Sequence, residues 1–72
     1  MIKVGQLRNY DGNILVVTKI FYDAVSGKYN ADVIYSDGFT DTYSTEFIEK
    51  HFKLVTTYQT WQEAVNSKGF KE

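Results

Sequence analysis

Two Asp-Gly dipeptides, Asp11-Gly12 and Asp37-Gly38, constrain the fold of this chain more than any other feature of its sequence. Tight β-hairpins need residues that accept positive φ angles, and Asp-Gly is one of the dipeptides that do so readily. Both dipeptides lie between runs of β-branched and aromatic residues, and the chain contains no proline. The sequence therefore predicts a small antiparallel β-structure.

The segments around these turns predict four strands, a short helix and a fifth strand. The second strand is long, and its first four residues, 14–17, are apolar on both faces, which indicates a bent strand shared between two layers of a small barrel. Ser44 is placed to cap the helix, because apolar residues follow it at helical spacing. The predicted ranges are 5–10, 14–22, 28–36 and 39–43 for the first four strands and 53–58 for the last strand. The short helix begins after Ser44, with Phe47, Ile48, His51 and Phe52 along one side.

A C-terminal helix is predicted over residues 59–69. Thr60 and Glu63 form a capping box, in which the side chain of each residue bonds the backbone N–H of the other. A helix of about two turns does not persist alone in water, so this one is expected to dock on the barrel, with Trp61 as its anchor. Gly69 suits the left-handed position that ends a helix.

The chain is short and contains no cysteine. Its 72 residues suit a single domain, 1–72. The lack of cysteine excludes disulfides and thiolate metal sites, and it fits a reducing compartment. The longest apolar run, residues 14–17, is far below the roughly 20 residues needed to cross a membrane, and the first residues lack the apolar core of a signal peptide. We therefore expect a cytoplasmic domain.

Charge is balanced overall, with 8 Lys and Arg against 9 Asp and Glu, but it is unevenly distributed. Residues 29–49 contain Asp32, Asp37, Asp41, Glu46 and Glu49 and no base. Because phosphate backbones are bound through clustered Lys and Arg, this distribution disfavours an unaided nucleic-acid binder.

The order of the predicted elements is strand, long bent strand, strand, strand, short helix, strand. It resembles the order in SH3-like barrels, including the Tudor and KOW types, over about residues 3–57. The predicted fold is thus mostly β: a small five-stranded SH3-like antiparallel barrel, with a short helix before the last strand and a C-terminal helix packed on it.

Three segments carry a second resemblance: Lys3–Gln6, Ile34–Phe39 and Tyr58–Ser67. They resemble small uncharacterised proteins carried by phages and prophages of low-GC Gram-positive bacteria. Those relatives have no assigned activity. The resemblance therefore implies a phage origin and the cytoplasm of a bacterial host cell, but no mechanism.

Residues suited to catalysis or metal binding are few. His51 is the only histidine, and neither spacing nor a nucleophile-elbow pattern supports a Ser-His-Asp arrangement of Ser44, His51 and Asp41. The acids Asp37, Asp41 and Glu46 lack the alternating oxygen ligands of a calcium loop, and one histidine without cysteine argues against zinc. The glycines are scattered and form no phosphate loop. We expect no enzyme, no cofactor and no metal site.

Aromatic residues flank the predicted turns, and they mark the only surface for which the sequence suggests a function. In SH3-like folds, aromatic residues at strand ends form grooves for proline-rich segments or cages for methylated lysine. Nearby acids would favour a basic partner. The alternative is that several of these aromatic residues simply pack the barrel or the terminal helix. The candidate partner-binding residues are Tyr22, Asp37, Phe39, Asp41 and Tyr43.

These features favour a non-catalytic protein-binding module, an accessory protein of a phage or prophage that binds a host or phage protein. One alternative is a nucleic-acid-binding small barrel in which Lys19, Lys28 and Lys53 gather on one side. Another is a structural or self-assembling phage protein, because a domain with a marginal core gains stability by forming homo-oligomers.

Overall fold

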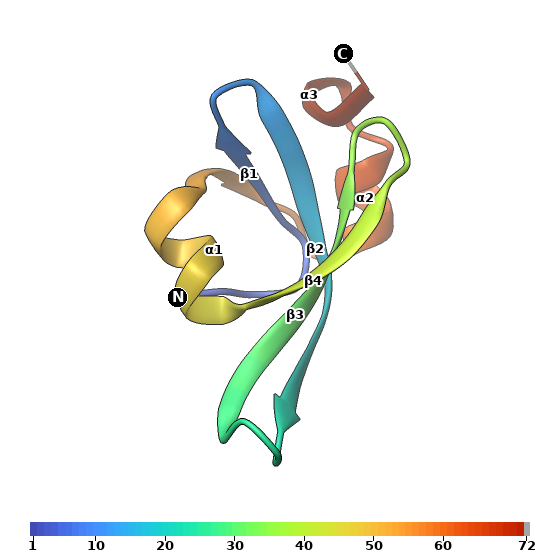
Figure 1. Ribbon diagram of the computed structural model, residues 1–72. Coiled ribbons are helices and arrows are strands. Elements are labelled where there is room, and N and C mark those ends of the chain that lie inside the picture. Colours follow the sequence, from blue (N-terminus) through green and yellow to red (C-terminus); the bar gives the residue numbers. More distant parts are fainter. Residues whose placement is uncertain (72) are drawn as a thin grey trace.

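The computed structural model describes residues 1–71, so the last position of the predicted 1–72 domain lies outside the described residues. Five antiparallel strands form one sheet in the order β4-β3-β2-β1-β5 (Figure 1). The strands are β1 (Gln6–Tyr10), β2 (Asn13–Asp23), β3 (Lys28–Tyr35), β4 (Thr40–Ser44) and β5 (Lys53–Thr57). The helices are α1 (Thr45–His51), α2 (Trp61–Val65) and α3 (Lys68–Lys71).

The two Asp-Gly turns both connect adjacent antiparallel strands, but their backbones differ. Asp11 and Gly12 both have positive φ angles, 50° and 86°, as a two-residue hairpin turn requires. In the second turn only Gly38 is positive, at 93°. That turn is wider, and its Asp37 carboxylate accepts a hydrogen bond from the backbone N–H of Phe39 at 2.9 Å.

The long strand β2 joins the two halves of the sheet. Its register with β3 shifts between Val17 and Lys19, which places a β-bulge at Thr18. A bulge bends a strand and increases its local twist. The edge strands β4 and β5 nevertheless do not pair within residues 1–71, so the sheet is not closed and the predicted barrel is not confirmed.

Two separate hydrophobic clusters lie on the two faces of the sheet. In Figure 1, α1 lies on one side of the sheet and α2 and α3 on the other. Leu15 and Val17 of β2 belong to one cluster and Val16 to the other, which explains the apolar run in the sequence. The first cluster contains Ile2, Leu15, Val17, Ala31, Val33, Ile48 and Phe52. The second cluster contains Leu7, Val16, Ala64 and Phe70.

The C-terminal capping box is confirmed, but the predicted helix is divided. The Thr60 hydroxyl oxygen accepts from the N–H of Glu63 at 3.2 Å, and the Glu63 carboxylate accepts from the N–H of Thr60 at 3.3 Å. The first helix already ends at Val65, with Asn66 as its C-cap. The prediction that Gly69 ends the helix is wrong, because Gly69 lies inside α3.

Trp61, the predicted anchor of the C-terminal segment, accounts for only part of its packing on the sheet. Its side chain packs against the second cluster and stays half-buried, whereas Ala64 and Phe70 are 0% and 6% exposed. Ala64 and Phe70 are therefore the buried anchors.

Gly5 holds the start of β1 close to the segment that follows β5. Its N–H donates to the carbonyl of Val17 at 2.9 Å, and its own carbonyl accepts from the N–H of Tyr58 at 3.0 Å. Its φ is 95°, and a Cβ here would collide with the carbonyl oxygen of Tyr58. Only glycine fits this position without strain.

Two buried polar side chains fix α1 against β1. Arg8 Nη1 donates to the carbonyl of Phe52 at 2.7 Å, and its Nε donates to Gln6 Oε1 at 3.0 Å. Burial lowers the pKa of Arg8, and the nearby charge of Glu49 partly offsets this. The bond to Phe52 occupies a carbonyl at the end of α1, which fixes the position of the helix that carries part of the candidate site.

Candidate partner-binding site

Four of the five residues predicted from the sequence gather along one edge of the sheet. In the pairing of β4 with β3, Asp41 lies opposite Val33 and Tyr43 lies opposite Ala31. Val33 and Ala31 belong to the first cluster, so Asp41 and Tyr43 face the same side of the sheet as that cluster. Asp37 and Phe39 lie in the turn that leads into β4. The alternation of acid and aromatic residue in the sequence thus becomes one continuous surface.

The first part of this surface is a hollow of about 340 Å³, here called the aromatic hollow. Two of its lining residues, Tyr35 and Tyr43, join their hydroxyl groups by a hydrogen bond of 2.7 Å. This bond and partial burial raise the pKa of Tyr43 well above its usual value, so the phenol stays neutral. Phe39 is 64% exposed. The hollow is lined by Asn13, Tyr35, Asp37, Phe39 and Tyr43.

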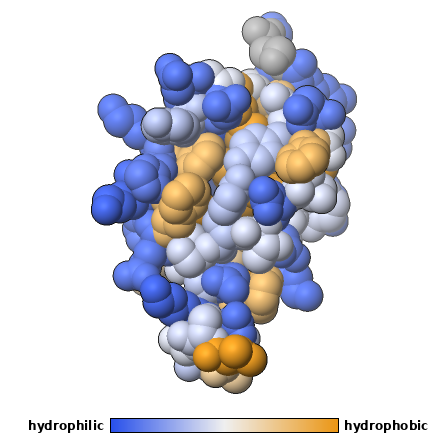
Figure 2. All heavy atoms as spheres, viewed as in Figure 1, coloured by the Kyte–Doolittle hydropathy of each residue, from blue (hydrophilic) through white to orange (hydrophobic). Residues whose placement is uncertain are grey.

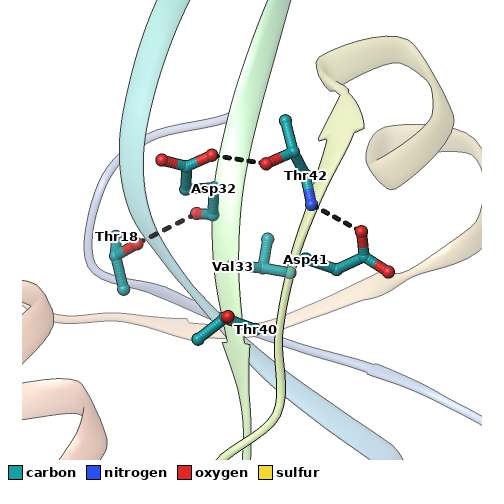
Figure 3. A pocket seen from close by; sticks show the side chains of 6 residues that line it. All are labelled: Thr18, Asp32, Val33, Thr40, Asp41 and Thr42. Atoms are coloured by element: carbon teal, nitrogen blue, oxygen red, sulfur yellow. Dashed lines mark hydrogen bonds between the residues drawn. The ribbon is translucent and has the colours of Figure 1, made fainter.

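The second part, the acidic hollow, has a volume of about 450 Å³ and spans the edge of β4 (Figure 3). The Thr42 hydroxyl donates to Asp32 Oδ1 at 2.7 Å, and the backbone N–H of Thr42 donates to Asp41 Oδ1 at 2.8 Å. These bonds orient the two carboxylates on either side of Thr42, each with acceptor capacity left for a cation. The hollow is lined by Thr18, Asp32, Val33, Thr40, Asp41 and Thr42.

Helix α1 extends the aromatic surface beyond β4. The ring centroid of Phe47 lies 5.1 Å from that of Tyr43 and 4.7 Å from that of His51. The Ser44 hydroxyl oxygen accepts from the N–H of Phe47 at 3.1 Å, which caps α1 as predicted. Phe47 is 42% exposed, so it adds apolar surface beside Tyr43 of the aromatic hollow.

Tyr22 does not join the other four residues. It pairs with Tyr29 near the tip of the β2–β3 hairpin, where their rings meet edge to face at 5.2 Å. That tip is at the bottom of Figure 1, and the β3–β4 turn is at the opposite end of β3. The tip has a hydrophobic patch of its own in Figure 2, where Val25 is 98% exposed.

Sequence reasoning missed Asp32 and Tyr35, which complete the two hollows. Their positions follow from the register of the β3–β4 hairpin, which sets Asp32 opposite Thr42. Asp32 and Thr42 are equally far from Asp37 in the sequence, so a hairpin folded at Asp37 sets them opposite each other. The turn dipeptide therefore contained the signal for Asp32.

In the part of the chain that the structure describes, no three His, Asp or Glu side chains gather as a metal site would need. None of the helices within residues 1–71 is long and apolar enough to cross a membrane. Comparison with family models, curated proteins and solved structures gives no match to this chain.

Proposed function

We propose that this domain is a non-catalytic protein-binding module that takes an extended, basic segment of a partner protein along β4. The observation that carries the proposal is the alternation of Asp37, Phe39, Asp41 and Tyr43 along one edge, where they line two adjacent hollows.

An extended segment suits this edge for a physical reason. β4 is an edge strand, and such strands present unpaired N–H and C=O groups to which another strand can bond. Side chains of an added strand alternate between the two faces, so successive residues reach different parts of the surface. Thr40, Asp41 and Thr42 are all exposed, which leaves the edge accessible.

Charge selects the kind of segment. Lysine or arginine placed beside Asp32 and Asp41 would form charge-assisted hydrogen bonds. A cation over the rings of the aromatic hollow would gain a cation–π contribution of roughly 0.5–1 kcal/mol at such an exposed site. The same residues would repel an acidic segment.

The strand order supports an SH3-like arrangement that stays open between β4 and β5. The resemblance to phage proteins makes a host or phage protein the expected source of the basic segment.

Nucleic acid finds less support as the partner. In the sheet, Lys28 lies opposite Asp23, at the C-terminal end of β2. Lys53 lies opposite Asn9 of β1, and Asn9 in turn lies opposite Ile14, near the N-terminal end of β2. The Nζ atom of Lys28 also lies 3.7 Å from Oε1 of Glu46, which forms an ion pair. Lys28 and Lys53, two of the three lysines expected to gather on one side, therefore lie near opposite ends of the sheet.

Binding of labelled peptides, followed by fluorescence anisotropy at low salt, tests the proposal. One probe is a peptide of alternating Lys and Thr, and its twin has Glu in place of every Lys. We expect the Lys peptide to bind and its Glu twin not to bind. Phe39→Ala removes an exposed ring from the centre of the surface and should weaken binding about tenfold or more.

Tyr22→Ala is the matched control, because Tyr22 is a similarly exposed aromatic residue at 56% but lies at the other end of β3. It should bind the Lys peptide as the natural chain does. Equal binding of the two peptides, or a folded Phe39→Ala chain that binds like the natural one, would contradict the proposal.

A further inference from the structure

The opposite edge of the sheet is also open, and its character differs from that of β4. All five residues of β5 are exposed, and within residues 1–71 the strand pairs only with β1. Leu54 and Val55 are 50% and 58% exposed. Natural edge strands are usually protected by charge, proline, a β-bulge or a covering element. The β1–β5 register shifts between Leu7 and Arg8 and leaves Val55 without a partner on β1. Two adjacent exposed aliphatic residues on this edge nevertheless indicate a strand that is covered in use.

A hollow of about 570 Å³ lies beside this edge. Tyr10, which is 52% exposed, stands next to Leu54 and Val55 in its wall, and the ring centroid of Tyr10 lies 6.4 Å from that of His51. Lys50 and Lys53 outnumber the single acid Asp11 in the lining. The edge is therefore apolar in the middle and basic around it.

We propose that β5 of one molecule pairs with β4 of a second copy of the same chain. Charge selects this combination. Pairing of β5 with a second β5 would bring two basic edges together, whereas β4 carries Asp41 and has Asp32 beside it. Both strands are five residues long and exposed at the edge, so their lengths match.

Such a contact is heterologous, because two different surfaces meet. The pair of copies keeps one free β4 edge on one copy and one free β5 edge on the other. Assemblies of this kind grow beyond a dimer into a ring or an open chain. Pairing of two five-residue strands buries less area than a standard interface, so the association is weak and depends on concentration. It also occupies the edge assigned above to a basic partner, and a partner segment would compete with it.

Sedimentation velocity from micromolar to millimolar concentration tests the pairing. We expect the sedimentation coefficient of the natural chain to rise with concentration at low salt and to rise less at high salt. Val55→Asp places an acid on the β5 edge, where it would face the acids of β4, and Asp41→Lys reverses the charge of the β4 edge. Each variant alone should stay monomeric where the natural chain assembles.

A mixture of the two variants provides the decisive measurement. Val55→Asp keeps an intact β4 edge and Asp41→Lys an intact β5 edge, so the mixture should assemble although neither variant does so alone. Val25→Asp is the matched control, since it makes the same substitution at the exposed hairpin tip, and it should assemble like the natural chain. Leu54→Asp replaces Val55→Asp if circular dichroism shows the latter unfolded.

A natural chain that stays monomeric throughout the concentration range would overturn the proposal. So would a mixture that contains only monomers, or an Asp41→Lys variant that still assembles through β5 alone. These outcomes are independent of peptide binding, because sedimentation uses no partner. A chain that assembles but ignores the Lys peptide would refute the proposed function and leave the edge pairing standing.

Discussion

The two clusters of this domain differ in how they are closed. The first cluster has seven buried members, and all lie between Ile2 and Phe52, on the sheet, α1 and the N-terminal segment. The second has four, of which Ala64 and Phe70 come from the two short C-terminal helices. The first cluster is thus completed by the sheet and its own connections, and the second depends on a terminal segment that docks from outside. This difference predicts two levels of stability within one small domain.

The aromatic parts of both proposed surfaces lie on the side of the first cluster. Tyr35 and Tyr43 of the aromatic hollow pack against that cluster, and Tyr10 beside the β5 edge lies 5.7 Å from the ring centroid of Phe52. Changes in the second cluster should therefore alter stability more than binding, whereas changes in the first should alter both.

Ile48→Ala tests the first cluster and has the largest expected effect. Ile48 is 0% exposed and is the buried residue through which α1 packs on the sheet. Its truncation should lower the free energy of unfolding by about 4 kcal/mol, near the upper end for a large-to-small core substitution. In urea unfolding, far-UV circular dichroism and the fluorescence of Trp61 should shift together. A loss below about 1 kcal/mol would show that α1 contributes little to this core.

The contrast between the clusters also explains what the sequence could predict. The predictions from local signals are confirmed, because the Asp11-Gly12 turn, the cap at Ser44 and the box formed by Thr60 and Glu63 each depend on residues a few positions apart. Closure of the sheet depends instead on how strongly the bulge at Thr18 bends β2, because this bend sets the distance between the edge strands β4 and β5. No local pattern encodes that distance, so the open edges could not be predicted.

The division of the C-terminal helix has a similar cause. The Asn66 side chain donates to the carbonyl of Gln62 at 2.9 Å, and the Ser67 hydroxyl donates to the carbonyl of Ala64 at 2.6 Å. Such bonds compete with continuation of a helix. The break lets Phe70 reach the second cluster, and this long-range contact outweighed the helix-ending signal of Gly69.

The part of the candidate site that depends on the alternation of side chains along a strand could be predicted from the sequence. Asp41 and Tyr43 share a face because they are two residues apart in a strand. Tyr22 also flanks a predicted turn, but it lies near the far end of the 11-residue strand β2 and therefore away from Asp41 and Tyr43. Leu54 and Val55 were missed, because an edge strand is recognised only from the order of strands in the sheet.

Phe70→Ala tests the second cluster and should have a smaller effect, about 3 kcal/mol, at the low end for truncation of a core phenylalanine. Phe70 is 6% exposed and belongs to the segment that docks from outside. Because Trp61 is the only tryptophan and packs on the same cluster, its fluorescence should change at lower urea concentration than the circular dichroism of the sheet. Coincident transitions of the two probes would show that both clusters unfold as one unit.

Thr60→Ala should have the smallest effect, because it changes only the start of α2. The substitution removes the hydroxyl oxygen that accepts from the N–H of Glu63, and loss of an N-cap costs about 1 kcal/mol. Trp61 follows the cap directly, so the loss should appear in the fluorescence transition, while binding of the Lys peptide stays unchanged. Thr60→Ser keeps the hydroxyl and should behave like the natural chain. If Thr60→Ala weakens peptide binding, the second cluster does more than stabilise the sheet, and the separation of the two faces fails.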